Sequence, residues 1–200
     1  MVFGDVLVIG GGYCFLLIVF TIVLTILVFV MPFALNHITN FTQGNRQIRL
    51  LLAFTIGVII VLTLGLRNFD EDLSFNFKLF QCYRGLANQL SYKWRTYGLK
   101  YDEKQFKIIS TGICNIVANI ALFVPFGCLL PRALPNQNFT WWKTLLIGFG
   151  FSLIVETTQL VTHRGCFDLD DLFHNSFGTV LGYALGKCVL FYTRNSETDS

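Results

Sequence analysis

Long apolar segments separated by shorter polar stretches dominate this chain. A helix that spans a membrane needs about 20 mostly apolar residues. Five segments meet or approach that length: 6–35, 50–66, 108–130, 141–161 and 172–192. The pattern therefore predicts an all-α polytopic membrane protein with about five transmembrane helices in one bundle. Pro125 lies within the third segment, so we expect it to break or kink that helix.

The composition agrees with a membrane location. Hydrophobic residues make up 54% of the 200 residues and charged residues only 14%, whereas soluble domains carry about 25% charged residues. The net charge of +3 is small and no basic stripe is interleaved with aromatic residues, so we expect no nucleic-acid partner. The first apolar segment is too long for a cleavable signal peptide and no Lys or Arg precedes it. We therefore expect it to remain as the first transmembrane helix.

Residues 67–107 form the long connection between the second and third segments. Within this connection, apolar residues recur at helical spacing opposite polar ones. The apolar positions are Phe75, Leu79, Tyr83, Leu86 and Leu90, and the polar positions are Lys78, Gln81, Arg84 and Asn88. This pattern predicts an amphipathic helix that ends near Trp94 and lies in the membrane interface or against the bundle. The chain then divides into two N-terminal transmembrane helices, the amphipathic connection, a three-helix core and a disordered polar tail: 1–66, 67–107, 108–192 and 193–200.

Basic residues favour a membrane orientation with the N-terminus outside. Arg46 and Arg49 follow the first segment, Arg132 and Lys143 follow the third, and neither loop contains an acid. Cytoplasmic loops carry an excess of Lys and Arg, and the first helix usually dominates the orientation. The connection at 67–107 holds eight basic residues and points the other way, so the preference rests on the first helix.

Polar side chains concentrate where the fourth segment passes into the fifth. Ser152, Glu156 and Gln159 are four and three residues apart and therefore share one face of a helix. One face of the following helix holds Asp168, Asp171, Asn175, Gly178 and Gly182. A carboxylate that faces lipid costs several kcal/mol, so both faces are expected to point into the bundle. With Arg164 in the turn, they predict a polar pocket near one membrane surface.

Each polar group also has a structural interpretation. The Asp residues can cap the start of the fifth helix, and Arg164 can form an ion pair with Glu156 or Asp168. Asn115 and Asn119 can join helices through hydrogen bonds, and the glycines allow helices to approach closely. However, three Asp, one Glu and one Arg within 16 residues exceed the needs of one cap and one ion pair. This excess points to a functional site.

Metal and cofactor sites are not indicated by the sequence. The nearest set of metal-ligand types is Asp168, Asp170, Asp171, His163 and His174, which lacks a fixed spacing such as H-E-x-x-H. No glycine-rich phosphate loop with a following Lys occurs. None of the six cysteines forms a C-x-x-C pair, and most lie in apolar segments, where they are expected as buried thiols. We therefore expect neither a metal nor a cofactor.

The third to fifth segments resemble the VanZ-like family over about residues 112–186. The matching positions are Asn119, Pro125, Gly127 and Pro131, the Ser152-x-x-x-Glu156-x-x-Gln159 spacing, and the run of Arg164, Asp168, Asp171, Asn175, Gly178 and Gly182. Earlier in the chain, the stretch Phe75–Lys78 lacks the Pro of the Asn-x-x-Pro-Phe element that the family often has. The N-terminal 66 residues match only as apolar segments.

The resemblance implies a multi-pass protein of the bacterial cytoplasmic membrane, associated with low-level resistance to the glycopeptide teicoplanin. It implies binding roles for Asn119, Glu156, Gln159, Arg164, Asp168, Asp171 and Asn175, and structural roles for Pro125, Gly127, Gly178 and Gly182. Three functions fit: an envelope protein that binds membrane lipid or a lipid-linked or glycopeptide ligand, an intramembrane enzyme with Glu156 or Asp171 as acid or base, and an accessory subunit. The leading hypothesis is the non-enzymatic envelope protein, without a fixed oligomeric state.

Overall fold

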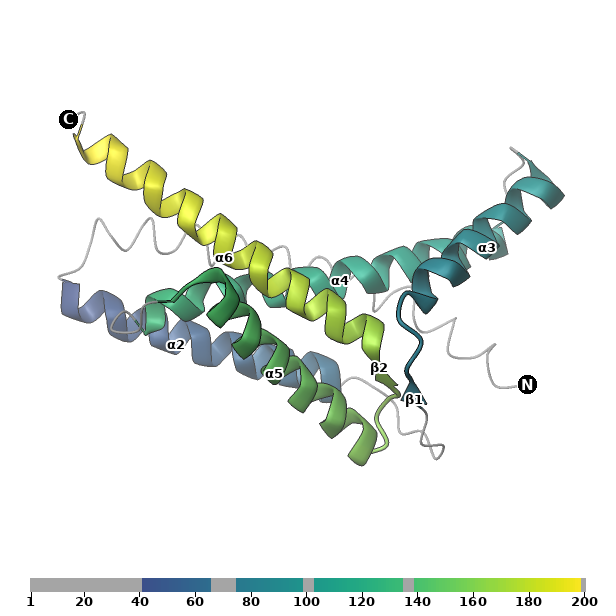
Figure 1. Cartoon of the computed structure of the whole chain (residues 1–200), viewed down its shortest axis with the longest axis horizontal. Helices are drawn as coiled ribbons and strands as arrows, with labels where there is room; N and C mark the ends of the chain where they lie inside the picture. The colour runs from purple at the N-terminus through teal and green to yellow at the C-terminus, as the bar shows by residue number, and fades with distance from the viewer. Residues whose placement is uncertain (1–40, 66–74, 99–102, 135–138, 199–200) are drawn as a thin grey trace.

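A computed structural model describes residues 41–65, 75–98, 103–134 and 139–198, and these residues are mostly helical (Figure 1). The helices are α2 (Phe41–Ile60), its continuation η1 (Val61–Gly65), which is a π-helix, α3 (Gln81–Tyr97), α4 (Glu103–Ala133), α5 (Trp141–Val161) and α6 (Leu169–Thr198). Two short strands, β1 (Phe75–Asn76) and β2 (Phe167–Asp168), pair in parallel. The predicted helical architecture is confirmed, with this small strand pair as an addition.

Three described helical stretches are long and apolar enough to cross a membrane. They are Arg46–Gly65, Phe106–Ala133 and Trp141–Val161, with mean hydropathies of 2.4, 2.1 and 1.5. They correspond to the predicted second, third and fourth segments. The fifth segment is helical within α6 but is not among these three, because residues such as His174, Asn175 and Lys187 lower its hydropathy. The first segment lies outside the described residues, so the count of five spans stays a prediction.

The helix α4 forms the centre of the bundle and packs against α2, α3, α5 and α6. Its side chains Leu122, Phe123 and Phe126 are buried and contact Ile59 of α2 and Val155 of α5. Proline removes a backbone donor and usually disrupts a helix. Nevertheless, α4 continues past residue 125 to Ala133, so the helix is not broken there. All residues from 122 to 130 are buried, and we attribute the continuity to this packing.

The helices α4 and α6 cross with their backbones in contact (Figure 1). A Cβ atom added at Gly127 would lie 1.9 Å from the carbonyl oxygen of Thr179. At Gly178 and Gly182 the added atom would lie 2.1 and 2.0 Å from carbonyl oxygens of α4. Such distances exclude any side chain, so these glycines permit the crossing, as small residues do in membrane helix pairs.

The amphipathic segment differs from its prediction at the N-terminal end. Phe75 is in a strand, because β1 pairs with β2 of the α5–α6 connection. Phe80 has a positive φ of 62°, and helix α3 begins only at the next residue. It ends at Tyr97, close to the predicted end near Trp94. The apolar residues from Phe75 onwards, which were predicted to lie on one helix, therefore belong to a strand, a turn and a helix.

The C-terminal end of the chain also differs from its prediction. The polar tail was expected to start at residue 193, but α6 continues to Thr198. No Gly or Pro occurs between Lys187 and Thr198, and these are the residues that most often end a helix. The polarity of the segment alone does not stop the helix.

Candidate functional site

The end of α5, the strand pair and the starts of α6 and α3 lie close together (Figure 1). Hydrogen bonds join a group of polar side chains there, about half of which are buried. We call this group the polar cluster. Its members are Asn76, Tyr83, Asn119, Ser152, Glu156, Asp168, Asp170, Asp171, His174 and Asn175. The cluster therefore draws on β1, β2, α3, α4, α5 and α6. Glu156 is 1% exposed, so its carboxyl group lies inside the protein.

Asp168 joins β1, α5 and α6. Its Oδ2 atom accepts a hydrogen bond from Asn76 Nδ2 at 3.0 Å, directly across the strand pair. Its Oδ1 atom accepts from the backbone N–H of Asp170 at 2.8 Å, which caps the start of α6. The backbone N–H of Asp168 donates to Glu156 Oε2 at 3.2 Å. The capping interpretation of the sequence thus applies to Asp168.

Asp170 caps a different helix, α3. Its Oδ2 atom accepts from the backbone N–H of Cys82 at 2.8 Å, and its Oδ1 atom accepts from the backbone N–H of Phe80. The first N–H groups of a helix lack partners within the helix, and a negative charge is favourable at that end. No side chain next to the start of α3 makes a capping hydrogen bond. Asp170 of α6 supplies it instead.

Burial and hydrogen bonds shift the pKa values of Asp170 and its neighbours. Burial raises the pKa of the Asp170 carboxyl, but hydrogen bonds from the side chain and backbone of Cys82 and from the backbone of Phe80 outweigh it, so the pKa lies below its ordinary value. Burial, together with the adjacent Asp170, raises the pKa of the Cys82 thiol to about 12. Burial also raises the pKa of Tyr83. Because the thiolate is the reactive form of cysteine, the raised pKa keeps Cys82 in its less reactive thiol form at neutral pH.

Two further hydrogen bonds join neighbouring helices within the cluster. Asn119 of α4 donates through Nδ2 to Oδ1 of Asp171 at 2.5 Å. Asn175 of α6 donates through Nδ2 to the hydroxyl oxygen of Ser152 in α5 at 2.9 Å. The structure therefore brings the Asn of the third segment to the acids of the fifth, while Asn115, one turn away, is exposed.

His174 and Asn175 hold the two polar atoms of the cluster that remain for a ligand. His174 Nε2 lies 2.8 Å from the hydroxyl oxygen of Tyr83. Within the described ranges, His174 Nδ1 and Asn175 Oδ1 are buried and have no hydrogen-bond partner. The two residues are only 1% and 3% exposed. Because most buried polar groups in proteins are paired, these two atoms are the unsatisfied hydrogen-bonding capacity of the cluster.

Gln159 and Arg164 face a neighbouring part of the structure, the end of η1. Gln159 Nε2 donates to the carbonyl oxygen of Thr63 at 3.2 Å. Arg164 is exposed, and its Nη1 donates to the carbonyl oxygen of Leu64 at 3.0 Å. Arg164 thus bonds to the backbone of η1 in place of the ion pair considered from the sequence.

The sequence did not assign Asn76, Tyr83, Asp170 or His174 to the binding site. The available signal was the start of α3, where an apolar run leads into a helix without a Ser, Thr, Asp or Asn cap. The missing cap indicates that a residue elsewhere in the chain bonds to the start of α3, but it does not identify that residue. In the described parts of the chain, no three His, Cys, Asp or Glu side chains converge as metal ligands.

One comparison places the chain among known proteins. A family model described as VanZ/LLP1 matches residues 13–191. The match extends beyond the resemblance seen at 112–186 and includes most of the first predicted segment. No curated protein and no solved structure matches the chain.

Proposed function

We propose that this chain, which belongs to the VanZ/LLP1 family, is a multi-pass protein of the bacterial cytoplasmic membrane that lowers susceptibility to teicoplanin and related lipoglycopeptides. It acts by binding an envelope ligand at the polar cluster, and the ligand is a glycopeptide or a lipid-linked precursor. The observation that carries this proposal is the cluster itself. In a chain with 54% hydrophobic residues, hydrogen bonds join polar side chains from four helices, and those of Ser152, Glu156, Asp170, His174 and Asn175 are buried. Such groups are rare within membranes and usually functional.

The proposed topology has five spans, with 6–35 and 172–192 added to the three stretches described above. The loop that carries Arg132 and Lys143 faces the cytoplasm, as the basic residues that follow the first segment favour. Because α5 runs from this loop to the polar cluster, the cluster lies near the outer surface. That is the side on which a glycopeptide meets the membrane.

Helix α3 is proposed to lie in the membrane interface beside the cluster. None of its residues is buried, and apolar side chains such as Leu90 and Trp94 remain 47% and 67% exposed. Arg84 and Arg95 on the same helix are exposed as well. A helix that exposes both apolar and basic side chains suits the boundary between headgroups and acyl chains. Its first turn is held by Asp170, so the helix is joined to the cluster.

The chemistry of the cluster favours a ligand with hydroxyl, amide or amine groups. Asn175 Oδ1 is an acceptor, and His174 Nδ1 donates or accepts according to its tautomer. The surrounding carboxyl groups of Asp168, Asp170 and Asp171 disfavour an anionic ligand. The two candidate catalytic acids are both engaged: Glu156 accepts from the Asp168 backbone, and Asp171 accepts from Asn119. Both carboxyls thus already accept hydrogen bonds within the protein, and their charges add to the preference for a neutral or cationic ligand.

The test is expression in a teicoplanin-sensitive bacterium, with susceptibility and membrane abundance measured on the same cells. The variants are Glu156→Gln and Asp171→Asn, which remove a charge with little change in shape. The matched control is Thr157→Val, because Thr157 is exposed on α5 next to Glu156. We expect the wild type and the control to protect the cells, and both cluster variants to lose protection at normal abundance.

Two results would contradict the proposal. If protection and abundance fall together in the cluster variants, the cluster holds the helices together and does not bind a ligand. If the wild type gives no protection at normal abundance, the role in teicoplanin susceptibility is wrong for this member of the family.

A further inference from the structure

A second polar feature lies between α4 and α6, at the opposite end from the polar cluster. Arg132 is thirteen residues beyond Asn119 on α4, which is about 20 Å along a helix that rises 1.5 Å per residue. Lys187 lies sixteen residues beyond Asp171 on α6, or about 24 Å. The two sites are therefore separated by much of the thickness of a bilayer core, which is about 30 Å.

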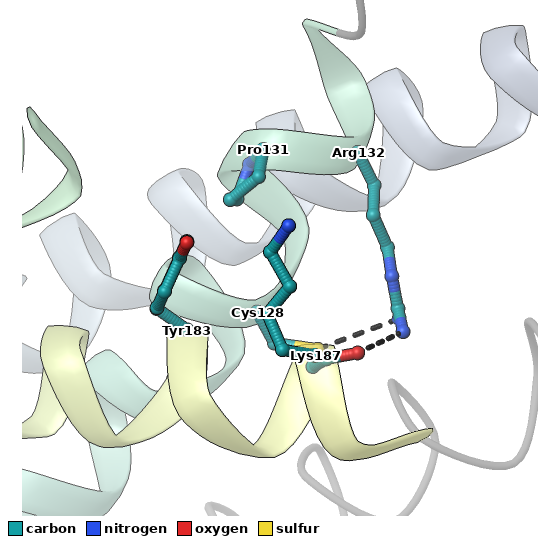
Figure 2. A pocket seen from close by; sticks show the side chains of 6 residues that line it. Cys128, Pro131, Arg132, Tyr183 and Lys187 are labelled. Atoms are coloured by element: carbon teal, nitrogen blue, oxygen red, sulfur yellow. Dashed lines mark hydrogen bonds between the residues drawn. The ribbon is translucent and has the colours of Figure 1, made fainter. Parts of the chain in front are cut away.

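This feature is a cavity of about 110 Å³ (Figure 2). Its lining residues are Cys128, Pro131, Arg132, Tyr183, Gly186 and Lys187. A single water needs roughly 10–15 Å³ of such space, so the cavity accommodates a group of several atoms. Among the described residues, the lining contains two basic side chains, one tyrosine and no acid, so these residues carry a net positive charge.

Arg132 is held in place by α6 and still has donors to offer. Its Nη2 donates to the carbonyl oxygen of Gly186 at 2.9 Å, and its Nη1 lies 3.5 Å from the sulfur of Cys128. Figure 2 shows both contacts where the side chain reaches across to α6. A guanidinium has five N–H donors in a planar fork, so these contacts leave most of them for a ligand. The fork matches the oxygens of a phosphate or carboxylate.

Lys187 supplies the second charge from the α6 side. It is exposed, and its Nζ lies 5.8 Å from the centre of the Tyr183 ring. Neither Arg132 nor Lys187 has an acidic partner among the residues that line the cavity. An oxyanion between the two cations would form charge-assisted hydrogen bonds, which are about twice as strong as neutral ones.

Neighbouring residues place the cavity at the level of the lipid headgroups. The apolar stretch of α4 ends at Ala133, next to Arg132. Trp141 and Trp142 begin α5 just beyond the connecting loop, and both are exposed. Tryptophan is enriched at the membrane–water interface. In the proposed topology this side faces the cytoplasm, where anionic lipids attract basic residues.

We propose that the cavity between α4 and α6 binds the phosphate of an anionic phospholipid, with Arg132 and Lys187 contacting its oxygens. This site is independent of the polar cluster. It takes an anionic ligand, whereas the carboxyl groups of the cluster disfavour anions. It gives the bundle a lipid contact in one leaflet that holds the ends of α4 and α6 together.

The test is native mass spectrometry of the full chain, purified in a neutral detergent and mixed with phosphatidylglycerol or with phosphatidylcholine of the same acyl chains. The variants are Arg132→Gln and Lys187→Gln. The matched control is Lys143→Gln, which removes one positive charge at the same end of the bundle outside the cavity lining. We expect the wild type and the control to retain phosphatidylglycerol in preference to phosphatidylcholine, and each cavity variant to bind it about tenfold more weakly.

Lys187→Gln keeps the test decisive if Arg132→Gln fails to fold, because Lys187 is exposed. Equal retention of the two lipids by the wild type would overturn the proposal, and so would an equal loss of binding in Lys143→Gln. Millimolar inorganic phosphate is added in a separate arm. Displacement of the lipid by phosphate would assign the cavity to a free anion and overturn the lipid assignment, whereas retention supports it.

Discussion

At the scale of single residues, the contact between Asp170 and the start of α3 makes the structure sensitive to pH. The pKa of Asp170 is lower in the folded protein than its ordinary value. Such a carboxylate stabilises the fold in full above its unfolded pKa of about 3.9, and this stabilisation is lost as the pH falls through the lower, folded pKa. We therefore expect the protection of α3 amide hydrogens, relative to their intrinsic exchange rate at each pH, to fall below about pH 4 in the wild type, measured by hydrogen-exchange mass spectrometry.

The variant Asp170→Asn separates this effect from general acid unfolding. Its amide oxygen can still accept from the N–H of Cys82, but the charge at the helix start is lost. We expect the local stability of α3 to fall by about 1 kcal/mol at neutral pH and to lack the further loss below about pH 4 that the wild type shows. Amides of α5 in the same sample serve as the internal reference. A wild-type α3 whose protection, relative to the intrinsic exchange rate, does not fall down to pH 3 would contradict the capping role.

At the scale of the elements, the crossing of α4 and α6 depends on glycine at the contact. A Cβ at residue 182 would lie 2.0 Å from the carbonyl oxygen of Val124, which is backbone and cannot rotate away. We expect Gly182→Ala to force the helices apart and lower the free energy of unfolding by about 1–3 kcal/mol. The measurement is the thermal unfolding midpoint of the purified protein in detergent.

Gly150→Ala is the matched control for this prediction. Gly150 is also in a helix, α5, but a Cβ atom there would meet nothing within 4 Å. Because glycine costs roughly 1 kcal/mol relative to alanine inside a helix, we expect this variant to be neutral or slightly stabilised. Equal destabilisation of the two variants would show that the loss of stability in Gly182→Ala does not come from the α4–α6 contact.

The helices were predictable from the sequence to different degrees for a physical reason. The bounds of α5 follow from apolar length alone, since a run of apolar residues is buried whatever its partner is. The start of α3 does not, because it depends on pairing between β1 and β2 and on a cap from Asp170, both far away in the sequence. Likewise, helical spacing shows that Asn119 and Asp171 face the interior, but not that they meet. Arg164 has the residue type for an ion pair, yet a backbone carbonyl of η1 is its partner.

At the scale of the whole molecule, the two ends of the bundle differ in charge. The end at the α5–α6 turn holds the acids of the polar cluster, whereas the other end carries Arg132, Lys143 and Lys187. The proposed topology places the end with Arg132, Lys143 and Lys187 in the cytoplasm. It rests on the basic residues that follow the first predicted segment, because the connection at 67–107 holds eight basic residues at the other end. It predicts opposite accessibility for Thr162, which is exposed beside the cluster, and Leu134, which is exposed at the end of α4.

A membrane-impermeant maleimide tests this orientation in intact cells, in a chain whose six cysteines are replaced by Ala or Ser. We expect Thr162→Cys to react in intact cells, and Leu134→Cys to react only after the membrane is permeabilised. Labelling after permeabilisation also shows that both cysteines can react. A cysteine that does not react in intact cells is therefore on the cytoplasmic side of the membrane and is not simply buried in the protein. The reverse pattern would place the polar cluster in the cytoplasm. An external glycopeptide could then not reach it, and a cytoplasmic envelope precursor would become its only available ligand.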